Sequence, residues 1–143
     1  MKKKLLTAIF SLGSMGLFGQ EEYLRDVSAT QNLSKTIASL FQENQIATAF
    51  GRLTPYWPMP QNEMEAIEEK TIKYLNLLEQ RFGKAIGFVK IKNETISDIA
   101  IRETYLVRYT NSAIRLKFTF YKNDRGWIVN AFNWDDSFTD EFE

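Results

Sequence analysis

The hydrophobic period of the chain changes at Gly83, and this change divides the sequence into two kinds of structure. Before Gly83, apolar residues recur three and four positions apart, which is the period of one helix face. After it, apolar and polar residues alternate, which is the period of a strand with one buried face. We therefore expect an α+β fold in which N-terminal helices pack on an antiparallel sheet.

The first half of the chain predicts three helices, over residues 27–43, 45–52 and 62–82. Asn62 is the expected N-cap of the third helix, and Gly83 is the expected residue that ends it. All three prolines lie in residues 54–60, and proline fixes φ and biases the residue before it away from the helical region. This stretch therefore predicts a rigid loop between helices.

The second half of the chain predicts a meander of about four antiparallel strands. Its clearest strand covers residues 114–122, where Ile, Leu and Phe alternate with charged and polar residues. Asn123 to Gly126 has the composition of a hairpin turn, with glycine able to adopt a positive φ. The four expected strands are residues 86–92, 96–109, 114–122 and 127–134.

Residues 1–19 have the pattern of a secretory signal peptide. Three lysines follow Met1, an apolar run covers residues 5–18, and Gly19 is a small residue at a plausible cleavage point. The apolar run is shorter than the roughly 20 residues that a membrane-spanning helix needs. We expect cleavage before a single domain of residues 20–143, with no membrane span afterwards and a periplasmic or secreted location. The alternatives are an uncleaved anchor and a hydrophobic first helix of a cytosolic domain.

The composition excludes several kinds of chemistry. The chain has no cysteine and no histidine, which excludes disulfides, a cysteine nucleophile, a Ser-His-Asp triad and a histidine zinc site. We expect no metal site and no cofactor. Removal of the lysines in residues 1–19 leaves 15 of the 18 basic residues against 18 acidic ones, a net charge of −3. That balance argues against a nucleic-acid partner.

The order of elements resembles the nuclear-transport-factor-like superfamily, which includes ketosteroid isomerases and polyketide cyclases, and within it small exported domains of unknown function. The resemblance rests on residues 47–50 with Leu53, on Gly83, and on the hairpin and aromatic strand of residues 121–130. It implies a curved meander that forms a cone with the helices. Cystatin-type inhibitors have a related shape, but their glutamine-valine-glycine loop is absent here.

The resemblance also implies a pocket at the mouth of the cone, between the concave sheet face and the helices. An aromatic wall with a few polar tips suits a small apolar ligand. The alternative is that these aromatic side chains fill the core. The candidate ligand-binding residues are Tyr56, Trp57, Tyr105, Tyr109, Phe118 and Phe120.

Glu103 is the weak candidate for a catalytic residue. It has the same strand parity as Ile101 and Tyr105, so the alternation places its carboxylate on the core face. There it could act as a general base, with Tyr105 or Tyr109 donating a hydrogen bond to an oxyanion. The alternative is a β-bulge that turns Glu103 to solvent. The catalytic motifs of the superfamily are not recognisable in this chain.

A basic stripe is expected on the other face of the sheet. Arg102, Thr104 and Arg108 alternate with the core positions of one strand, and Arg115 and Lys117 with those of the next. Residues 135–143 carry five acids and no base. The stripe could receive an acidic partner or the chain's own acidic segment. The alternatives are an ordinary solvated face whose charges discourage edge pairing, and a frayed acidic end.

These patterns favour a small exported domain that binds a ligand or a protein without catalysis. Its partner would be a small apolar molecule or an envelope protein. Two other functions stay open. One is assembly as a homodimer through the sheet face, and the other is a small isomerase or cyclase that uses a buried carboxylate and a tyrosine.

Overall fold

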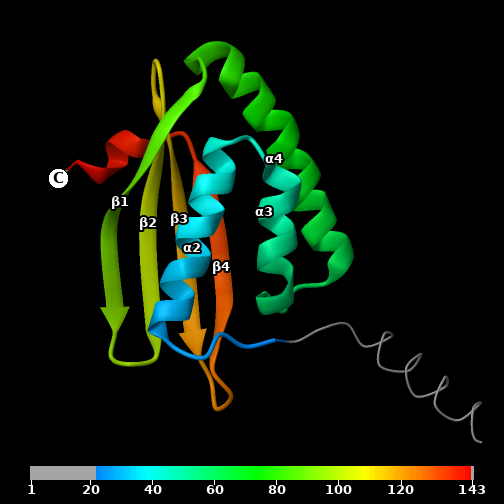
Figure 1. Ribbon diagram of the computed structural model, residues 1–143, viewed down its shortest axis with the longest axis vertical. Coiled ribbons are helices and arrows are strands. Elements are labelled where there is room, and N and C mark those ends of the chain that lie inside the picture. Colours follow the sequence, from blue (N-terminus) through cyan, green and yellow to red (C-terminus); the bar gives the residue numbers. More distant parts are fainter. Residues whose placement is uncertain (1–21, 143) are drawn as a thin grey trace, which may run out of the picture.

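A computed structural model describes residues 22–142 and confirms the α+β fold (Figure 1). The predicted signal peptide, residues 1–19, lies outside the described residues. Within these residues, three α-helices precede a sheet of four antiparallel strands in the order β1-β2-β3-β4. The elements are α2 (Val27–Gln42), α3 (Ile46–Leu53), the 3₁₀ turn η1 (Thr54–Tyr56), α4 (Gln61–Phe82), β1 (Ala85–Ile96), β2 (Ala100–Tyr109), β3 (Ala113–Lys122), β4 (Trp127–Asp135) and the 3₁₀ turn η2 (Phe138–Glu141).

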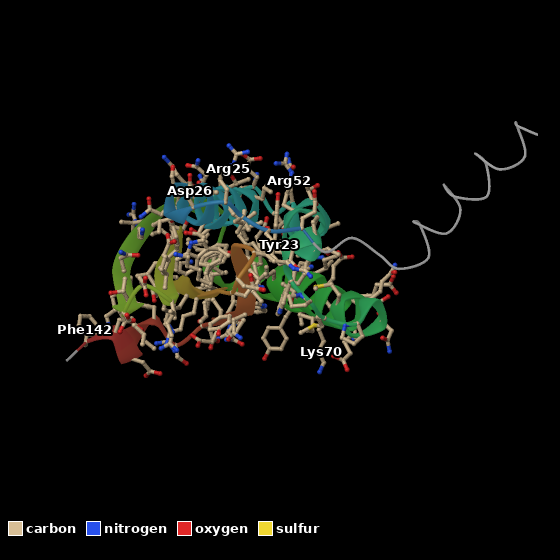
Figure 2. All side chains as sticks on the ribbon, turned by 90° about the horizontal axis from the view of Figure 1, so that it is seen from below. Tyr23, Arg25, Asp26, Arg52, Lys70 and Phe142 are labelled. Atoms are coloured by element: carbon tan, nitrogen blue, oxygen red, sulfur yellow. The ribbon has the colours of Figure 1, made fainter. Side chains whose placement is uncertain are left out.

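The helices lie on one face of the sheet, and η2 lies on the other. Helix α2 contacts β1, β2 and β3, α3 packs on α2, and α4 packs on α3. Seen from below, α2 and the segment that carries Phe142 lie on opposite sides of the sheet (Figure 2). We call the face that carries η2 the outer face. None of the helices within residues 22–142 combines the length and the hydropathy needed to cross a membrane.

An aromatic cluster fills the space between the helices and the sheet. Phe118 of β3 and Phe132 of β4 have ring centroids 4.9 Å apart, and Phe41 and Phe50 stand edge-on to Phe132 at 5.6 and 6.0 Å. Each buried aromatic ring removes a large apolar area from water. Without any cysteine, this burial is the main source of stability for the domain.

Two element boundaries differ from the sequence-based prediction. Strand β1 continues to Ile96, and a tight turn with Ser97 at φ 48° leads into β2, whereas we expected Ile96 to begin the second strand. No glycine or proline marks this turn, and its only signal in the sequence is the pair Ser97-Asp98, which is weaker than glycine or proline. Helix α4 begins at Gln61, and the carbonyl of Pro60 accepts the first hydrogen bonds. Asn62 is therefore not its N-cap.

Gly83 ends α4 as predicted. Its φ of 83° is in the left-handed region, and its N–H donates to the carbonyl of Glu79. A Cβ at this position would lie 3.0 Å from Cβ of Thr110, so the turn into β1 has no room for a side chain. Glycine is required here both for its backbone conformation and for the close approach of the neighbouring loop.

The segment before α2 is already attached to the free edge of β4. Leu24 and Trp127 exchange two backbone hydrogen bonds of 2.8 Å in an antiparallel bridge. Gly126 precedes this bridge at φ 152°, and a Cβ there would lie 2.8 Å from the carbonyl oxygen of Leu24. The β4 edge thus accepts an extended segment at its first residue.

We expect Phe118→Ala to lower the free energy of unfolding by about 3–5 kcal/mol, the usual cost of a large cavity in a core. Urea unfolding monitored by circular dichroism measures this. Phe142→Ala is the matched control, because Phe142 is 77% exposed, and it should change stability by less than about 0.5 kcal/mol. Equal effects of the two substitutions would contradict the core position of Phe118.

Candidate functional site

Five of the six predicted ligand-binding residues lie in the filled core, and four of them line no described pocket. Phe118 and Phe120 are fully buried and stack at 6.5 Å, and Tyr105 stands edge-on to Phe118 at 5.9 Å. Tyr109 is also buried and packs against Phe82 at 6.0 Å. None of these four residues lines any of the four pockets described below. A ligand in the cone would have to displace them.

Tyr56 and Trp57 differ from the other four residues because they line a pocket. They line a pocket of about 120 Å³ between the proline-rich loop and the β3–β4 hairpin, together with Tyr23 and Ile128. Trp57 itself is buried and stands edge-on to Phe132 at 6.3 Å. The structure therefore does not bring the six residues together into one wall.

Glu103 lies on the core face, as its parity predicted. It is fully buried, and its Oε1 accepts a hydrogen bond of 2.8 Å from Ser34 of α2 and an ion pair of 2.9 Å from Nζ of Lys90. The bulge that we considered lies in the neighbouring strand β1, between Lys90 and Lys92, so Glu103 is not turned to solvent. This bulge puts Lys90 opposite Tyr105, within reach of the carboxylate.

The contacts of Glu103 are those of an ion pair that stabilises the fold, and not those of a general base that faces a pocket. Burial is the main cause that raises the pKa of Tyr105, and the negative charge of Glu103 adds to it, so Tyr105 stays a neutral phenol. Burial likewise raises the pKa of Tyr109 to about 12. Glu103 lines none of the four pockets, and Ser34 and Lys90 occupy its Oε1. The cluster ties α2, β1 and β2 together.

The widest of the four pockets is an open groove between α4 and β4, with a volume of about 600 Å³. Two aromatic side chains form its wall. Trp134 donates its indole N–H to Oγ1 of Thr71 at 3.1 Å, and Tyr74 stands edge-on to it at 5.9 Å. The groove is lined by Ile67, Lys70, Thr71 and Tyr74 of α4 and by Phe132, Asn133, Trp134, Asp135 and Asp136 at the end of β4.

The groove lies beside a sheet edge. Strand β4 pairs with β3 on one side, and within residues 22–142 its other side pairs only with Leu24, at Trp127. Beyond that bridge, the strand presents backbone N–H and C=O groups to whatever enters the groove. An open edge of this kind is a template for another strand.

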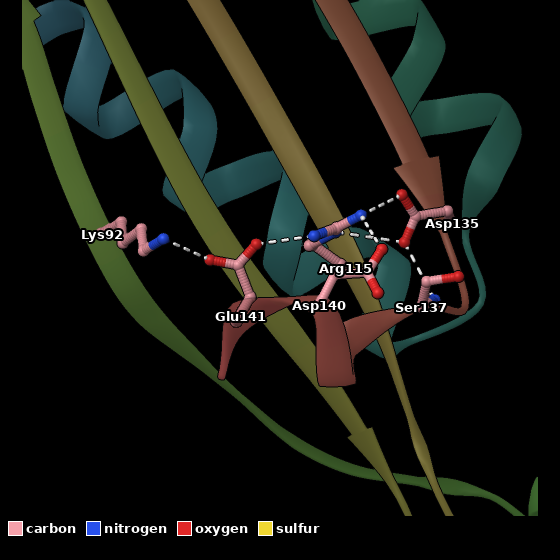
Figure 3. Close-up of polar contacts among 6 residues, drawn as sticks. All are labelled: Lys92, Arg115, Asp135, Ser137, Asp140 and Glu141. Carbon is pink, nitrogen blue, oxygen red and sulfur yellow. Dashed lines mark hydrogen bonds and ion pairs between the residues drawn. The ribbon is translucent and has the colours of Figure 1, made fainter. Parts of the chain in front are cut away.

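On the outer face, an ion-pair cluster holds the acidic segment against the sheet (Figure 3). Nε and Nη2 of Arg115 donate to the carboxylate of Asp135 at 3.1 and 2.7 Å, and Nη1 donates to Glu141 at 2.6 Å. Nζ of Lys92 lies 2.8 Å from the second oxygen of Glu141. The alternative of a frayed acidic end is therefore wrong for residues 136–142. Of the two uses that we considered for the stripe, the structure shows a contact with the chain's own acidic segment, at Arg115.

These contacts favour the charged form of each partner, so they raise the pKa of the arginine and lower the pKa values of the two carboxyl groups. Hydrogen bonds to Asp135 raise the pKa of Arg115 above its usual range. Burial would raise the pKa of Asp135, but the hydrogen bonds from Arg115 and from the Ser137 N–H outweigh it, and the net shift is downward. The hydrogen bond from Lys92, followed by that from Arg115, lowers the pKa of Glu141.

Sequence reasoning missed the residues that define the groove and the cluster partners. Tyr74 lies seven residues after Ile67, on the same side of α4, but the helical period does not show whether its ring packs or stays exposed. Trp134 lies in a strand that we expected. Its contact with Thr71 of α4 could not be predicted, because it depends on how the helix packs beside the sheet. Lys90 and Lys92 became partners of Glu103 and Glu141 only through the β1 bulge.

Comparison with protein-family models, with curated proteins and with solved structures gave no significant match to this chain. Membership of the nuclear-transport-factor-like superfamily therefore stays a prediction. Within residues 22–142, no group of three or more acidic side chains is placed to hold a metal ion.

The two partners of the Glu103–Lys90 ion pair should contribute unequally to the free energy of unfolding. Lys90→Met leaves a buried carboxylate without its cation, so we expect it to lower the free energy of unfolding by about 1–3 kcal/mol. Glu103→Gln should cost less, because the Lys90 side chain is 31% exposed and can turn to water. Urea unfolding measures both, with Lys84→Met as an exposed control. A larger cost for Glu103→Gln would contradict this asymmetry.

Proposed function

We propose that this protein is an exported, non-catalytic interaction domain that binds an extended segment of a partner protein in the groove between α4 and β4. The observation that carries the proposal is the position of the groove, where the exposed ring of Tyr74 and the half-buried ring of Trp134 lie directly beside an open strand edge. The aromatic core fills the interior of the domain, so binding is expected at the surface instead.

The strand edge favours an extended peptide over a compact ligand. A peptide that adds to a sheet edge gains main-chain hydrogen bonds, while neighbouring pockets select its alternate side chains. The bridge between Leu24 and Trp127 is a precedent at this edge, since it already joins one extended segment to β4 in antiparallel orientation. The partner segment would continue the same edge from Ile128 toward Asp135.

The aromatic wall supplies the apolar contact. Tyr74 is 57% exposed, which leaves most of its ring available to a partner. Trp134 is held by its hydrogen bond to Thr71, so little rotamer freedom is lost when a ligand packs on it. Lys70 and Asp136 line the same groove with opposite charges. Charges at a rim act mainly on specificity and on the rate of association.

A displayed library of random peptides, panned against residues 20–143, tests the groove. We expect enriched sequences in which apolar and polar residues alternate, because every second side chain would enter the groove. Chemical-shift changes on adding the best peptide should map to β4 and to the face of α4 that carries Tyr74. Enrichment of compact apolar ligands in a parallel screen, with no peptide binding, would contradict the proposal.

Matched variants of the protein and of the peptide sharpen this test. Tyr74→Ser should weaken peptide binding about tenfold, the equivalent of 1.4 kcal/mol. Tyr121→Ser is the control, because Tyr121 is an exposed tyrosine on the outer face of the sheet, away from the groove. N-methylation of alternate peptide nitrogens should abolish binding if the peptide joins the edge. Binding that survives both changes would exclude strand addition.

Export is the second part of the proposal, and it is supported by the pattern of residues 1–19. Expression of residues 1–143 in a bacterium with two membranes should yield a periplasmic product whose N-terminus is Gln20. Mass spectrometry of the fractionated cells measures this. The control is the chain without residues 2–19, which should stay in the cytoplasm. A product that keeps residues 1–19 would contradict cleavage.

A further inference from the structure

We propose that the outer face of the sheet carries a binding site for acidic peptide segments, which residues 136–142 of the chain itself occupy in this structure. The site is formed by Arg115 of β3, Lys92 of β1 and Thr104 of β2. It is separate from the groove between α4 and β4 and does not depend on the function proposed above.

Two cations from different strands converge on one carboxylate. Arg115 donates from Nη1 to one oxygen of Glu141 at 2.6 Å, and Nζ of Lys92 lies 2.8 Å from the other oxygen (Figure 3). The Nε and Nη2 edge of Arg115 is already used by Asp135, which belongs to the sheet. Nη1 is therefore the part of the guanidinium that is available to a carboxylate from outside the sheet.

A third polar group lies on the same face. Thr104 is on the strand between the two cations and pairs in register with Lys92 and Lys117. It is only 1% exposed, yet its hydroxyl has no hydrogen-bond partner. A buried hydroxyl without a partner is rare because its desolvation is not compensated. An acidic ligand that lies slightly deeper than Glu141 would supply that partner.

The segment that occupies the site is held to the sheet mainly by polar contacts. None of the residues of η2 is buried, and Phe142 is 77% exposed. Its polar contacts with side chains of the sheet are the ion pairs of Asp140 and Glu141 with Arg115 and Lys92, and the hydrogen bond from the Ser137 N–H to Asp135. A segment with few apolar contacts can detach from the fold at a free-energy cost far below that of unfolding the whole domain. Another acidic segment can therefore replace this one.

The charge around the site selects the class of ligand. Arg102 and Arg108 are exposed on β2 on the same face, and within the described residues neither forms an ion pair. Lys117 lies close enough to lower the pKa of Asp135. The positive electrostatic potential of these side chains attracts acidic partners and repels basic ones.

The site should also respond to acid. The pKa of Glu141 is lowered, mainly by Lys92 and then by Arg115, so its contribution to holding the segment is complete above its ordinary value of 4.5 and is lost as pH falls through the lowered value. Asp135 has a lowered pKa and behaves in the same direction. The charged groups that face Glu141 in the cluster are Lys92, Arg115, Lys117, Asp135 and Asp140.

The test uses the whole domain, residues 20–143, with Asp140→Asn and Glu141→Gln combined to empty the site. The probe is a labelled synthetic peptide of residues 136–143, added in trans and followed by fluorescence anisotropy. We expect the double variant to bind the peptide at least about tenfold more tightly than the unchanged domain, because the internal segment no longer competes. Hydrogen exchange should show that residues 137–142 lose protection in the double variant.

Matched controls separate this site from general charge attraction. Lys92→Gln, added to the double variant, should weaken peptide binding about tenfold, whereas Lys84→Gln, an exposed lysine before β1, should not. A peptide with asparagine and glutamine in place of Asp140 and Glu141 should not bind. Binding of the acidic peptide should also fall as pH drops below about 4, where carboxylates protonate.

Three outcomes would overturn the proposal. The first is a double variant that releases residues 137–142 but binds no peptide, with or without dimerising through its outer face. The second is protection of residues 137–142 that persists in the double variant, since packing would then hold the segment. The third is peptide binding that Lys92→Gln and Lys84→Gln weaken equally, because that result describes non-specific attraction.

Discussion

The ring of Phe132 on β4 is the point on which the helices pack against the sheet, and its centroid lies 4.9 Å from that of Phe118 on β3. Phe41 and Phe50 pack edge-on to Phe132 from α2 and α3, so two helices and two strands meet at one ring. Because interiors are packed like organic crystals, this cluster leaves little room for a ligand between the helices and the sheet. Any binding by this domain is consequently directed to its edges and outer face.

The end of β4 links the two surfaces that remain. Trp134 points to the helix side, where it forms the wall of the groove, and Asp135 points to the outer face, where it holds Arg115. Successive side chains of a strand alternate between faces, so adjacent residues serve different sites. The groove and the Arg115 cluster therefore meet at the end of β4.

Much of the fold could be predicted because the signals were local. The helix that ends at Gly83 and the alternating strand of β3 follow from short-range patterns, and so does the core-facing position of Glu103. The turn at Ser97 was missed, because Ser97-Asp98 is a weak turn signal and a left-handed serine is uncommon. The bulge in β1 was also missed, because an extra residue shifts register without changing hydrophobicity. That bulge decides which lysine meets Glu103.

By itself, the sequence determined the order of helices and strands, the core-facing positions of the regular strand β3, and the absence of cysteine and histidine chemistry. Tertiary structure alone decided that the aromatic residues fill the space between helices and sheet, that Tyr74 and Trp134 form an open groove, and that Glu141 reaches Arg115 and Lys92. The physical reason is the distance along the chain over which each kind of interaction acts. Period and turn chemistry act between neighbours along the chain, whereas a groove or an ion-pair cluster depends on packing between segments far apart in sequence.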